Sequence, residues 1–292
     1  MSSTRTILVT GANGQVGSEF RVLSKSYPQY NFLFVTKDEL PIDDVDAVKK
    51  YFDIHGIQFC VNCAAYTVVD KAETESEKAF LINADAVGNL AAVCKSHSTQ
   101  FIHISTDYVF DGTATAPYLE SNPVKPLGVY GASKLKGEQL ALEKNPDTII
   151  VRTSWVYSSF GNNFVKTMLR LMKERESISV VNDQQGCPTY AADLANAIMQ
   201  IINKHPTSHI VHQTSIYNYS NSGVINWYQF AVAIKELTNS KCIVNSIPSS
   251  QYPTPAKRPQ YSVLDTTKIR GTFAITIPAW KDSLVKCLAL LK

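Results

Sequence analysis

Apolar runs bounded by turn residues alternate with helix-patterned stretches along the first half of the chain. Runs such as RTILVTG and NFLFVT are apolar almost throughout, as is typical of strands that are covered on both faces. The predicted strands are residues 5–11, 31–36, 59–65, 99–106 and 148–157, and the predicted helices are residues 15–26, 46–56, 76–97 and 130–144. This alternation predicts an α/β fold with a Rossmann-like, doubly wound parallel sheet.

The pattern changes after Tyr157. The helical stretches that follow are residues 164–175, 191–204 and 226–238, and the strand-like runs are residues 178–183 and 208–215. Turn-rich residues 184–190 separate these elements, and the proline-rich residues 247–259 are expected to form an ordered loop or a linker. We predict an NAD(P)-binding Rossmann domain at 1–157. A smaller, mainly substrate-binding α/β domain is predicted at 158–292, with residues about 191–216 returning to the Rossmann sheet.

A glycine-rich turn joins the first strand to the first helix. Residues 10–17 read TGANGQVG, in which Gly11 permits a tight turn and Gly14 lets backbone N–H groups approach a pyrophosphate. Gly17 lets the helix pack closely on the sheet, and the positive end of the helix dipole faces the phosphates. The strand before the turn and the helix after it predict a dinucleotide site.

The end of the second strand bears on the choice between NAD and NADP. An acidic residue there favours the 2′-hydroxyl of NAD, whereas a cation favours the 2′-phosphate of NADP. Thr36 is followed by Lys37 and Asp38 side by side, so the residues leave the choice open. We expect NADPH, with NADH tolerated.

A tyrosine and a lysine stand four residues apart in YGASKLKGE. On a helix, Tyr130 and Lys134 share a face. A nearby ammonium is expected to lower the pKa of the phenol and make Tyr130 a usable general acid. Thr106 or Ser105, at the end of the preceding strand, can hold a carbonyl oxygen. Together these groups suit hydride transfer to or from a carbonyl carbon.

Longer stretches in the same order strengthen this interpretation. They are GANGQVG, VNCAAYTVVDKAE, STDYVFDG, VYGASKLKGE, RTSWVY, GNNFVKTML, NDQQGCPT and YPTPAKRPQYSVLD, and they span nearly the whole chain. The chain resembles the extended short-chain dehydrogenases/reductases and, within them, the dTDP-4-dehydrorhamnose reductases. The resemblance implies NAD(P)H-dependent reduction of the C4 keto group of dTDP-4-dehydro-β-L-rhamnose to dTDP-L-rhamnose.

The resemblance also assigns site residues. The implied catalytic residues are Thr106, Tyr130 and Lys134, with Tyr130 as the proton donor. The implied cofactor residues are Gly11, Asn13, Gly14, Gln15, Val16, Gly17, Thr36, Lys37, Asp38, Ile42, Ala64, Ala65, Tyr66, Thr67, Tyr130 and Lys134. The implied substrate residues are Thr106, Asp107, Tyr130, Trp155, Asn163, Gln184, Pro188 and Arg258.

The chain departs from the family pattern at a few positions. The family often has Leu-Asp-Ile where this chain has Leu40-Pro41-Ile42, so only Ile42 is kept as a cofactor residue. Cys63 stands where the family usually has an alanine, and Ile104 stands where it often has an aromatic residue. We expect no metal site. Some relatives hold magnesium between subunits, however, and Glu19 matches one of those positions, so Mg²⁺ is kept as an alternative. Cys60 and Cys63 form a CxxC, but residues three apart on a strand point to opposite faces.

Composition limits the partners. The net charge of +3 is too mild to indicate nucleic acid, and no apolar run reaches the roughly 18 residues that span a bilayer. We expect a cytoplasmic monomer or homodimer that binds a dTDP-sugar. The six histidines show no ligand spacing, and Trp227 and Phe230 are expected to pack in the core.

Two other functions stay open. One is reduction or epimerisation of another nucleotide sugar. The other is a non-catalytic NADP-binding regulatory subunit, like the relatives that regulate methionine adenosyltransferase. The intact trio of Thr106, Tyr130 and Lys134 argues against a pure binder, because binding alone needs no proton donor.

Overall fold

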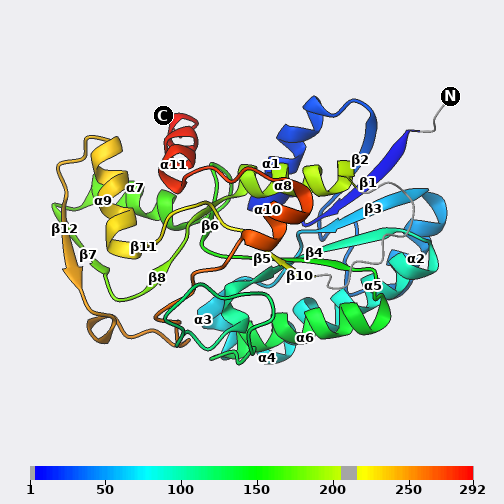
Figure 1. The fold of residues 1–292 in the computed structure, drawn as a ribbon, viewed down its shortest axis with the longest axis horizontal. Coiled ribbons are helices and arrows are strands. Elements are labelled where there is room, and N and C mark those ends of the chain that lie inside the picture. Colours follow the sequence, from blue (N-terminus) through cyan, green and yellow to red (C-terminus); the bar gives the residue numbers. More distant parts are fainter. Residues whose placement is uncertain (1–3, 205–215, 292) are drawn as a thin grey trace.

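The computed structural model describes residues 4–204 and 216–291, and a parallel sheet forms its centre (Figure 1). The strands are β1 (Arg5–Thr10), β2 (Tyr30–Val35), β3 (Ile57–Asn62), β4 (Gln100–Thr106), β5 (Ile149–Thr153) and β10 (Ile216–Asn218). They form a six-stranded sheet in the order β10-β5-β4-β3-β1-β2, and each pairing is parallel. The doubly wound sheet predicted from the sequence is confirmed.

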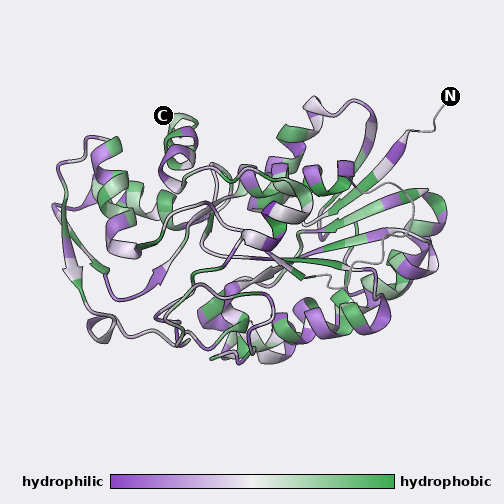
Figure 2. Cartoon of the chain, viewed as in Figure 1, coloured by the Kyte–Doolittle hydropathy of each residue, from purple (hydrophilic) through white to green (hydrophobic). Residues whose placement is uncertain are grey.

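Helices cover both faces of this sheet. One face carries α1 (Gln15–Leu23), α8 (Ala191–Lys204) and α10 (Thr267–Phe273), and the other carries α2 (Val45–Ile54), α5 (Ala86–Ser96) and α6 (Val129–Lys144). Along β1, Ile7 and Val9 pack beside Phe20 of α1, whereas Leu8 packs beside Phe52 of α2. Successive strand residues point to opposite faces, so the central strands are apolar almost throughout (Figure 2).

The predicted helix at 76–97 is interrupted. It consists of α4 (Ser76–Phe80), a π-helical turn (Leu81–Asp85) and α5. In the turn, the buried Asn83 amide accepts a hydrogen bond from the Tyr66 N–H at 2.9 Å. It donates to the Tyr66 carbonyl and the Ser133 hydroxyl, each at 3.0 Å. A π-helical turn often marks a functional region, and this one fixes the backbone of a predicted cofactor residue.

The predicted strand at 148–157 was wrong as a single element. Strand β5 ends at Thr153, and Trp155 has a φ of +48°. Val156 and Tyr157 form β6, which pairs with β9 (Thr189–Tyr190) outside the central sheet. A left-handed residue cannot continue an extended strand, so the chain turns away at Trp155.

The remaining elements form a second core beside the sheet. They are α7 (Phe164–Glu174), β7 (Ser177–Val181), β8 (Gln185–Gly186), β11 (Ile225–Asn226), α9 (Trp227–Leu237), β12 (Ile243–Ile247) and α11 (Trp280–Ala289). Strand β12 pairs in parallel with β7, and β11 pairs antiparallel with β8. Val165, Phe230 and Leu284 are fully buried in this core. Helices α7 and α9 follow their predicted stretches, whereas α10 and α11 were not predicted.

The chain returns to the sheet late in the sequence. Helix α8 packs on α1, and β10 extends the sheet beside β5. The predicted strand at 208–215 lies outside the described residues. The predicted domain limits at 157 and 158 stay a prediction.

Candidate active site

The reversal of strand order places two loops together at the carboxyl ends of β1 and β3. Strands β2 and β3 lie on opposite sides of β1, and ligands of doubly wound sheets bind at such a switch point. Gly11 follows β1 with a φ of +62°, and a Cβ there would lie 2.6 Å from the Ala64 nitrogen. The glycine turn therefore touches the loop after β3 that contains Ala65, Tyr66 and Thr67, all predicted to line the cofactor.

The N-terminus of α1 fits a pyrophosphate. Gly14 is its N-cap, and no side chain caps the helix there. Gly14 and Asn13 are exposed, and a Cβ on Gly17 would lie 2.5 Å from the Gly11 oxygen. Only glycine at position 17 lets the first turn of α1 pack so closely on the glycine turn. The backbone N–H groups of this first turn have no side-chain cap and are available to an anion. The residues present thus suit an anionic dinucleotide.

Gln15 and Asn163 lie together although they were assigned to different ligands. The Asn163 amide donates to the Gln15 side-chain oxygen at 3.0 Å and to the Ser158 carbonyl at 2.8 Å. Its own oxygen accepts from the Lys166 N–H at 3.1 Å and caps α7. Asn163 therefore lies on the glycine-turn side of the site, next to Gln15. Val16 is buried.

The loop after β2 contains an acid that sequence reasoning missed. The Glu39 carboxylate accepts the Thr36 N–H at 2.8 Å, whereas Lys37 and Asp38 are exposed. This backbone hydrogen bond lowers the pKa of Glu39. Ile42 is buried a few residues later. The exposed Lys37 and Asp38 can still meet a ribose substituent.

Two elements bring the catalytic candidates together. Thr106 ends β4, while Tyr130 and Lys134 lie in α6, which packs on β4. The Thr106 hydroxyl donates to Asp107 Oδ1 at 3.0 Å. Ser105, the other candidate, has a buried Oγ with no hydrogen-bond partner among the described residues. Thr106 is the hydroxyl that interacts with Tyr130.

The pKa of Tyr130 differs from the expectation. Burial raises the pKa of Tyr130 to about 12, the Thr106 hydroxyl acts against this rise, and Asp107 adds to it. The expected net lowering of this pKa was wrong, because burial and the Asp107 charge raise it by more than the Thr106 hydroxyl lowers it. The phenol therefore keeps its proton at neutral pH, as a proton donor requires.

Lys134 is held by the strand beneath it. Its Nζ donates to the Ile104 carbonyl at 2.7 Å and lies 3.2 Å from His103 Nε2. Burial lowers the pKa of Lys134 to about 8, while Glu138 and Cys63 act in the opposite direction. Burial also lowers the pKa of His103, and Lys134 adds to this effect. His103 is therefore a neutral partner of Lys134.

A buried polar chain connects Lys134 to the glycine turn. The Asn62 amide nitrogen lies 3.1 Å from His103 Nδ1, and its oxygen accepts from Thr10 Oγ1 at 2.6 Å and from the Ala64 N–H at 3.2 Å. Sequence reasoning missed His103 and Asn62, because neither motif nor spacing connects them to Lys134. It also missed Glu138, which the four-residue spacing from Lys134 could have revealed.

Asp107 carries a polar atom that suits a substrate. The side chain is 2% exposed, and its Oδ2 has no hydrogen-bond partner among the described residues. Burial raises the pKa of Asp107 to about 6, while the hydroxyls of Ser262 and Thr106 act against it. An unpartnered carboxylate oxygen is costly inside a protein, and a sugar hydroxyl would satisfy it.

Trp155 is half-buried and stacks on another indole. The rings of Trp155 and Trp227 lie 3.6 Å apart at 10°. A Cβ on Gly186 would lie 2.6 Å from the Trp155 ring, so glycine there makes room for it. Trp227 and Phe230 belong to the second core, as expected. Trp227 also supports a predicted substrate residue, which the helical pattern did not indicate.

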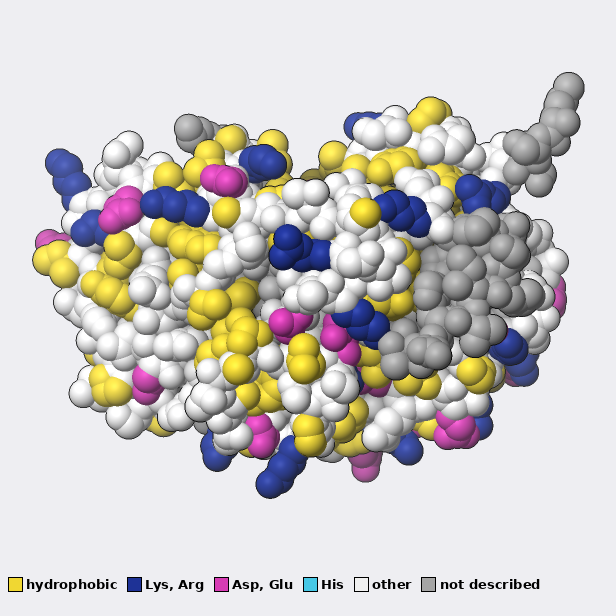
Figure 3. Space-filling model, viewed as in Figure 1, with side chains coloured by type: hydrophobic (Ala, Val, Ile, Leu, Met, Phe, Trp, Pro, Cys, Tyr) yellow, Lys and Arg dark blue, Asp and Glu magenta, His cyan; other side chains and the backbone are white. Residues whose placement is uncertain are grey.

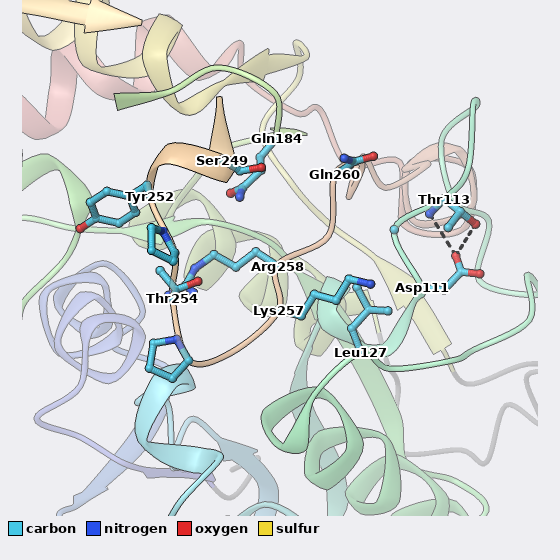
Figure 4. Close-up of a pocket in the computed structure, with 13 residues that line it drawn as sticks. Asp111, Thr113, Leu127, Gln184, Ser249, Tyr252, Thr254, Lys257, Arg258 and Gln260 are labelled. Atoms are coloured by element: carbon cyan, nitrogen blue, oxygen red, sulfur yellow. Dashed lines mark hydrogen bonds between the residues drawn. The ribbon is translucent and has the colours of Figure 1, made fainter. Parts of the chain in front are cut away.

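A cavity of about 460 Å³ lies between the segment after β12 and the loop after β4. Figure 4 shows Lys257, Arg258 and Gln260 on that segment, whereas Gln184 comes from the loop after β7. This volume is in the range typical of ligand pockets. Tyr108 lies between the pocket and the catalytic residues. The charge of Arg258 opposes the rise in the pKa of Tyr108 that burial causes, and the Tyr108 ring packs edge-on against Tyr130 at 5.5 Å. Of the predicted substrate residues, Gln184 and Arg258 line this pocket, whereas Pro188 is buried.

The metal alternative finds no support. Glu19 is 4% exposed, and its carboxylate accepts the Ser158 hydroxyl at 2.6 Å. Burial raises the pKa of Glu19. Within residues 4–204 and 216–291, no group of three or more His, Cys, Asp or Glu side chains could hold a metal ion. Cys60 and Cys63 are free thiols.

Surface charge does not gather on the face shown in Figure 3, where Lys and Arg side chains are interspersed with Asp and Glu. Among the described helices, none is long and apolar enough to cross a membrane.

Known proteins similar to this chain cover nearly all of it. The family described as "RmlD substrate binding domain" matches residues 5–292. A dTDP-4-dehydrorhamnose reductase from Aggregatibacter actinomycetemcomitans is 41% identical over 284 residues, covering 95% of this chain and 96% of that protein. A crystal structure of a dTDP-4-dehydrorhamnose reductase from Clostridium acetobutylicum has a TM-score of 0.92 at 39% identity, covering 98% of this chain and 99% of that one. The enzyme from Bacillus anthracis in complex with NADP has a TM-score of 0.92 at 36% identity, with the same coverage of 98% and 99%.

Proposed function

The chain belongs to the RmlD family of dTDP-4-dehydrorhamnose reductases, and from this premise we propose how its own residues carry out the reaction. The protein is an NAD(P)H-dependent oxidoreductase that reduces the 4-keto group of dTDP-4-dehydro-β-L-rhamnose to the hydroxyl of dTDP-L-rhamnose. The observation that supports the residue assignment is the trio of Thr106, Tyr130 and Lys134 at the end of β4. His103 and Asn62 connect this trio to the glycine turn.

Each residue of the trio has a separate task. NADPH, when bound, supplies the hydride to the carbonyl carbon. Tyr130 donates its phenolic proton to the carbonyl oxygen, and its pKa of about 12 keeps that proton in place until it is needed. The Thr106 hydroxyl orients the same oxygen. The Lys134 ammonium stabilises the phenolate that forms.

The substrate extends from the trio into the pocket. Asp107 accepts a sugar hydroxyl at its unpartnered Oδ2, and Trp155 offers a flat apolar face to the deoxysugar. Arg258 and Lys257 provide positive charge for the diphosphate, and Gln184 lines the same pocket. Asn163 and Pro188 stay predictions as substrate residues.

The assay that tests this function measures NADPH oxidation with dTDP-4-dehydro-β-L-rhamnose. The corresponding UDP and GDP sugars are assayed separately as alternative substrates. We expect the dTDP-sugar to give the highest kcat/KM. Equal rates with the UDP-sugar would instead favour a reductase of another nucleotide sugar, and binding of NADPH without turnover of any sugar would favour the regulatory subunit.

NADPH is proposed as the preferred cofactor, with Lys37 meeting the 2′-phosphate. We expect Lys37→Ala to weaken NADPH binding by about 3–10-fold and NADH binding little, since an exposed cation is partly screened by water. Asp38→Ala should weaken NADH binding more than NADPH binding, because it removes an acceptor for the 2′-hydroxyl of NADH. Fluorescence titration of both cofactors measures this. Equal changes for NADPH and NADH in each variant would show that neither residue contacts the 2′ position.

The pH dependence should reflect Lys134. Since burial lowers its pKa to about 8, the ammonium is lost above that pH, and kcat is expected to fall there. Tyr130, with a pKa of about 12, keeps its proton throughout this range. Steady-state rates from pH 6 to pH 10 measure this fall in kcat. Lys134→Arg keeps its positive charge over this range, so whatever activity the variant retains should not fall above pH 8. A flat profile up to pH 10 in the unaltered enzyme would exclude this role.

Other properties stay predictions. The mild net charge of +3 supports a small-molecule partner and not nucleic acid. A cytoplasmic location and a monomeric or homodimeric state were predicted from the sequence and have no further support. The buried position of Glu19 supports activity without added magnesium.

A further inference from the structure

One face of the substrate pocket is formed by residues 252–260, which follow the short helix Ser249–Gln251. Both cations of the pocket, Lys257 and Arg258, lie in this segment. In the short helix just before the segment, the Ser249 N–H and hydroxyl bind the Asp183 carboxylate at 2.8–3.0 Å. At its end, the Gln260 carbonyl accepts the Gln185 N–H at 2.7 Å. The two contacts are therefore made by neighbouring residues of the chain, Asp183 in the loop after β7 and Gln185 at the start of β8.

The middle of the segment is tied to a distant part of the chain. Asp70 lies in α3 (Val69–Ala72), directly after the predicted cofactor loop. Its carboxylate accepts the Ala256 N–H at 3.2 Å, Arg258 Nη1 at 3.0 Å and Arg258 Nη2 at 2.8 Å. Ala256 and Arg258 are 186 and 188 residues away along the chain. One carboxylate thus fixes both a backbone position and a guanidinium of the pocket wall.

The contacts of Arg258 use one end of its guanidinium. Nη1 donates to Asp70 and to the Ala256 carbonyl at 3.0 Å, and Nη2 donates to Asp70. Among the hydrogen bonds of the described residues, none starts from Arg258 Nε. The Nε–H and the second Nη2 hydrogen form the side edge of the guanidinium, which can bind two phosphate oxygens. A carboxylate on one edge and a phosphate on the other are compatible.

We propose that Asp70 is a positioning residue that holds Arg258 so that its Nε edge faces the diphosphate of the nucleotide sugar. This inference rests on the proposed function, because it assumes that the pocket binds the diphosphate. Asp70 itself does not line the pocket and acts through Arg258 and through the backbone at Ala256.

The charges around Arg258 indicate that Asp70 positions this arginine and does not compete with the diphosphate for it. Arg258 donates to both Asp70 oxygens, and this pairing is the main reason that the pKa of Asp70 lies below its usual value. Asp70 therefore stays ionised at neutral pH and offsets the guanidinium charge, while Lys257 adds a second cation to the wall. Without Asp70, Arg258 would sample many rotamers and the segment would lose its central attachment. An ordered arginine loses less entropy when it binds a phosphate.

Binding of dTDP alone tests the inference without turnover. Calorimetry on the full-length protein should show that Asp70→Asn raises the Kd for dTDP about 5–10-fold, as expected for partial loss of a bidentate contact. Arg258→Gln should raise it at least as much, and Asp70→Asn should add nothing in the Arg258→Gln background, because both variants remove one interaction. Asp70→Glu, which keeps the carboxylate, should recover part of the affinity. Glu77→Gln removes one exposed acid from neighbouring α4 and should leave the Kd unchanged.

Kinetics separate positioning from damage to the fold. Asp70→Asn should raise KM for the nucleotide sugar while kcat, NADPH affinity and Tm stay near their original values. Tighter dTDP binding in Asp70→Asn would show that Asp70 competes with the diphosphate. An unchanged Kd, or additive effects of Asp70→Asn and Arg258→Gln, would also overturn the proposal. If the unaltered protein binds dTDP but reduces no dTDP-sugar, the proposed function fails while this test still stands.

Discussion

Tyr130→Phe is expected to lower kcat by about 10²–10⁴-fold, because a positioned general acid contributes about that much. The variant lacks the phenolic proton that we assign to the carbonyl oxygen. Phenylalanine keeps the ring, which packs edge-on against Tyr108 at 5.5 Å, so the fold should persist. Steady-state rates with the dTDP-sugar measure the loss, and NADPH titration should give a nearly unchanged Kd.

Tyr108→Phe is the matched control. Tyr108 lies beside Tyr130, and burial raises its pKa as well, so it too keeps its proton. Tyr108, however, contacts the Thr106 hydroxyl only through its backbone N–H, at 3.2 Å, whereas Tyr130 interacts with that hydroxyl through its phenol. We expect Tyr108→Phe to retain most of kcat. Near-normal turnover of Tyr130→Phe, or an equal loss in both variants, would exclude Tyr130 as the specific proton donor.

Glu138→Gln is expected to destabilise the protein by about 3–5 kcal/mol, because it leaves a buried cation without its counter-charge. The Glu138 carboxylate accepts Arg152 Nε at 2.9 Å and Nη2 at 2.7 Å, and the two side chains are 2% and 3% exposed. Glutamine keeps the shape of the glutamate side chain and one of its hydrogen-bond acceptors, so the substitution tests the loss of the negative charge. Urea unfolding followed by circular dichroism measures the free energy of unfolding.

Glu143→Gln is the control on the same helix. Its partner is Lys144, and both side chains are at least half exposed, so the change should barely alter stability. Replacing both Glu138 and Arg152 by leucine and methionine should recover much of the loss, since the unpaired charge is then gone. A Glu138→Gln variant as stable as Glu143→Gln would show that the buried pair does not depend on charge.

Glu138 also connects stability to the site. It raises the pKa of Lys134 and therefore opposes the lowering by burial. In Glu138→Gln the fall in kcat should move to a pH below about 8. Because the variant is expected to be less stable, its kcat should be measured at a temperature below its Tm, where the protein is folded.

The sequence by itself determined the elements that local periodicity defines. The continuous apolar run of β1 and the glycine turn after it are local features of a few residues, so they could be predicted without the fold. The spacing of Tyr130 and Lys134 likewise placed both on one helix face, and the order of matching stretches indicated the family. Helix 191–204 was predicted with the limits that α8 has.

The tertiary structure decided the features that depend on burial or on distant residues. The left-handed backbone at Trp155, supported by Gly186 and Trp227, broke a run that otherwise has the pattern of a strand. Burial, and not Lys134, determines the pKa of Tyr130, because desolvation depends on everything that surrounds the phenol. The contact between Asp70 and Arg258 has no local signal either, since 188 residues separate them. Such properties arise only when the whole chain encloses a group, which is why no short stretch of sequence predicts them.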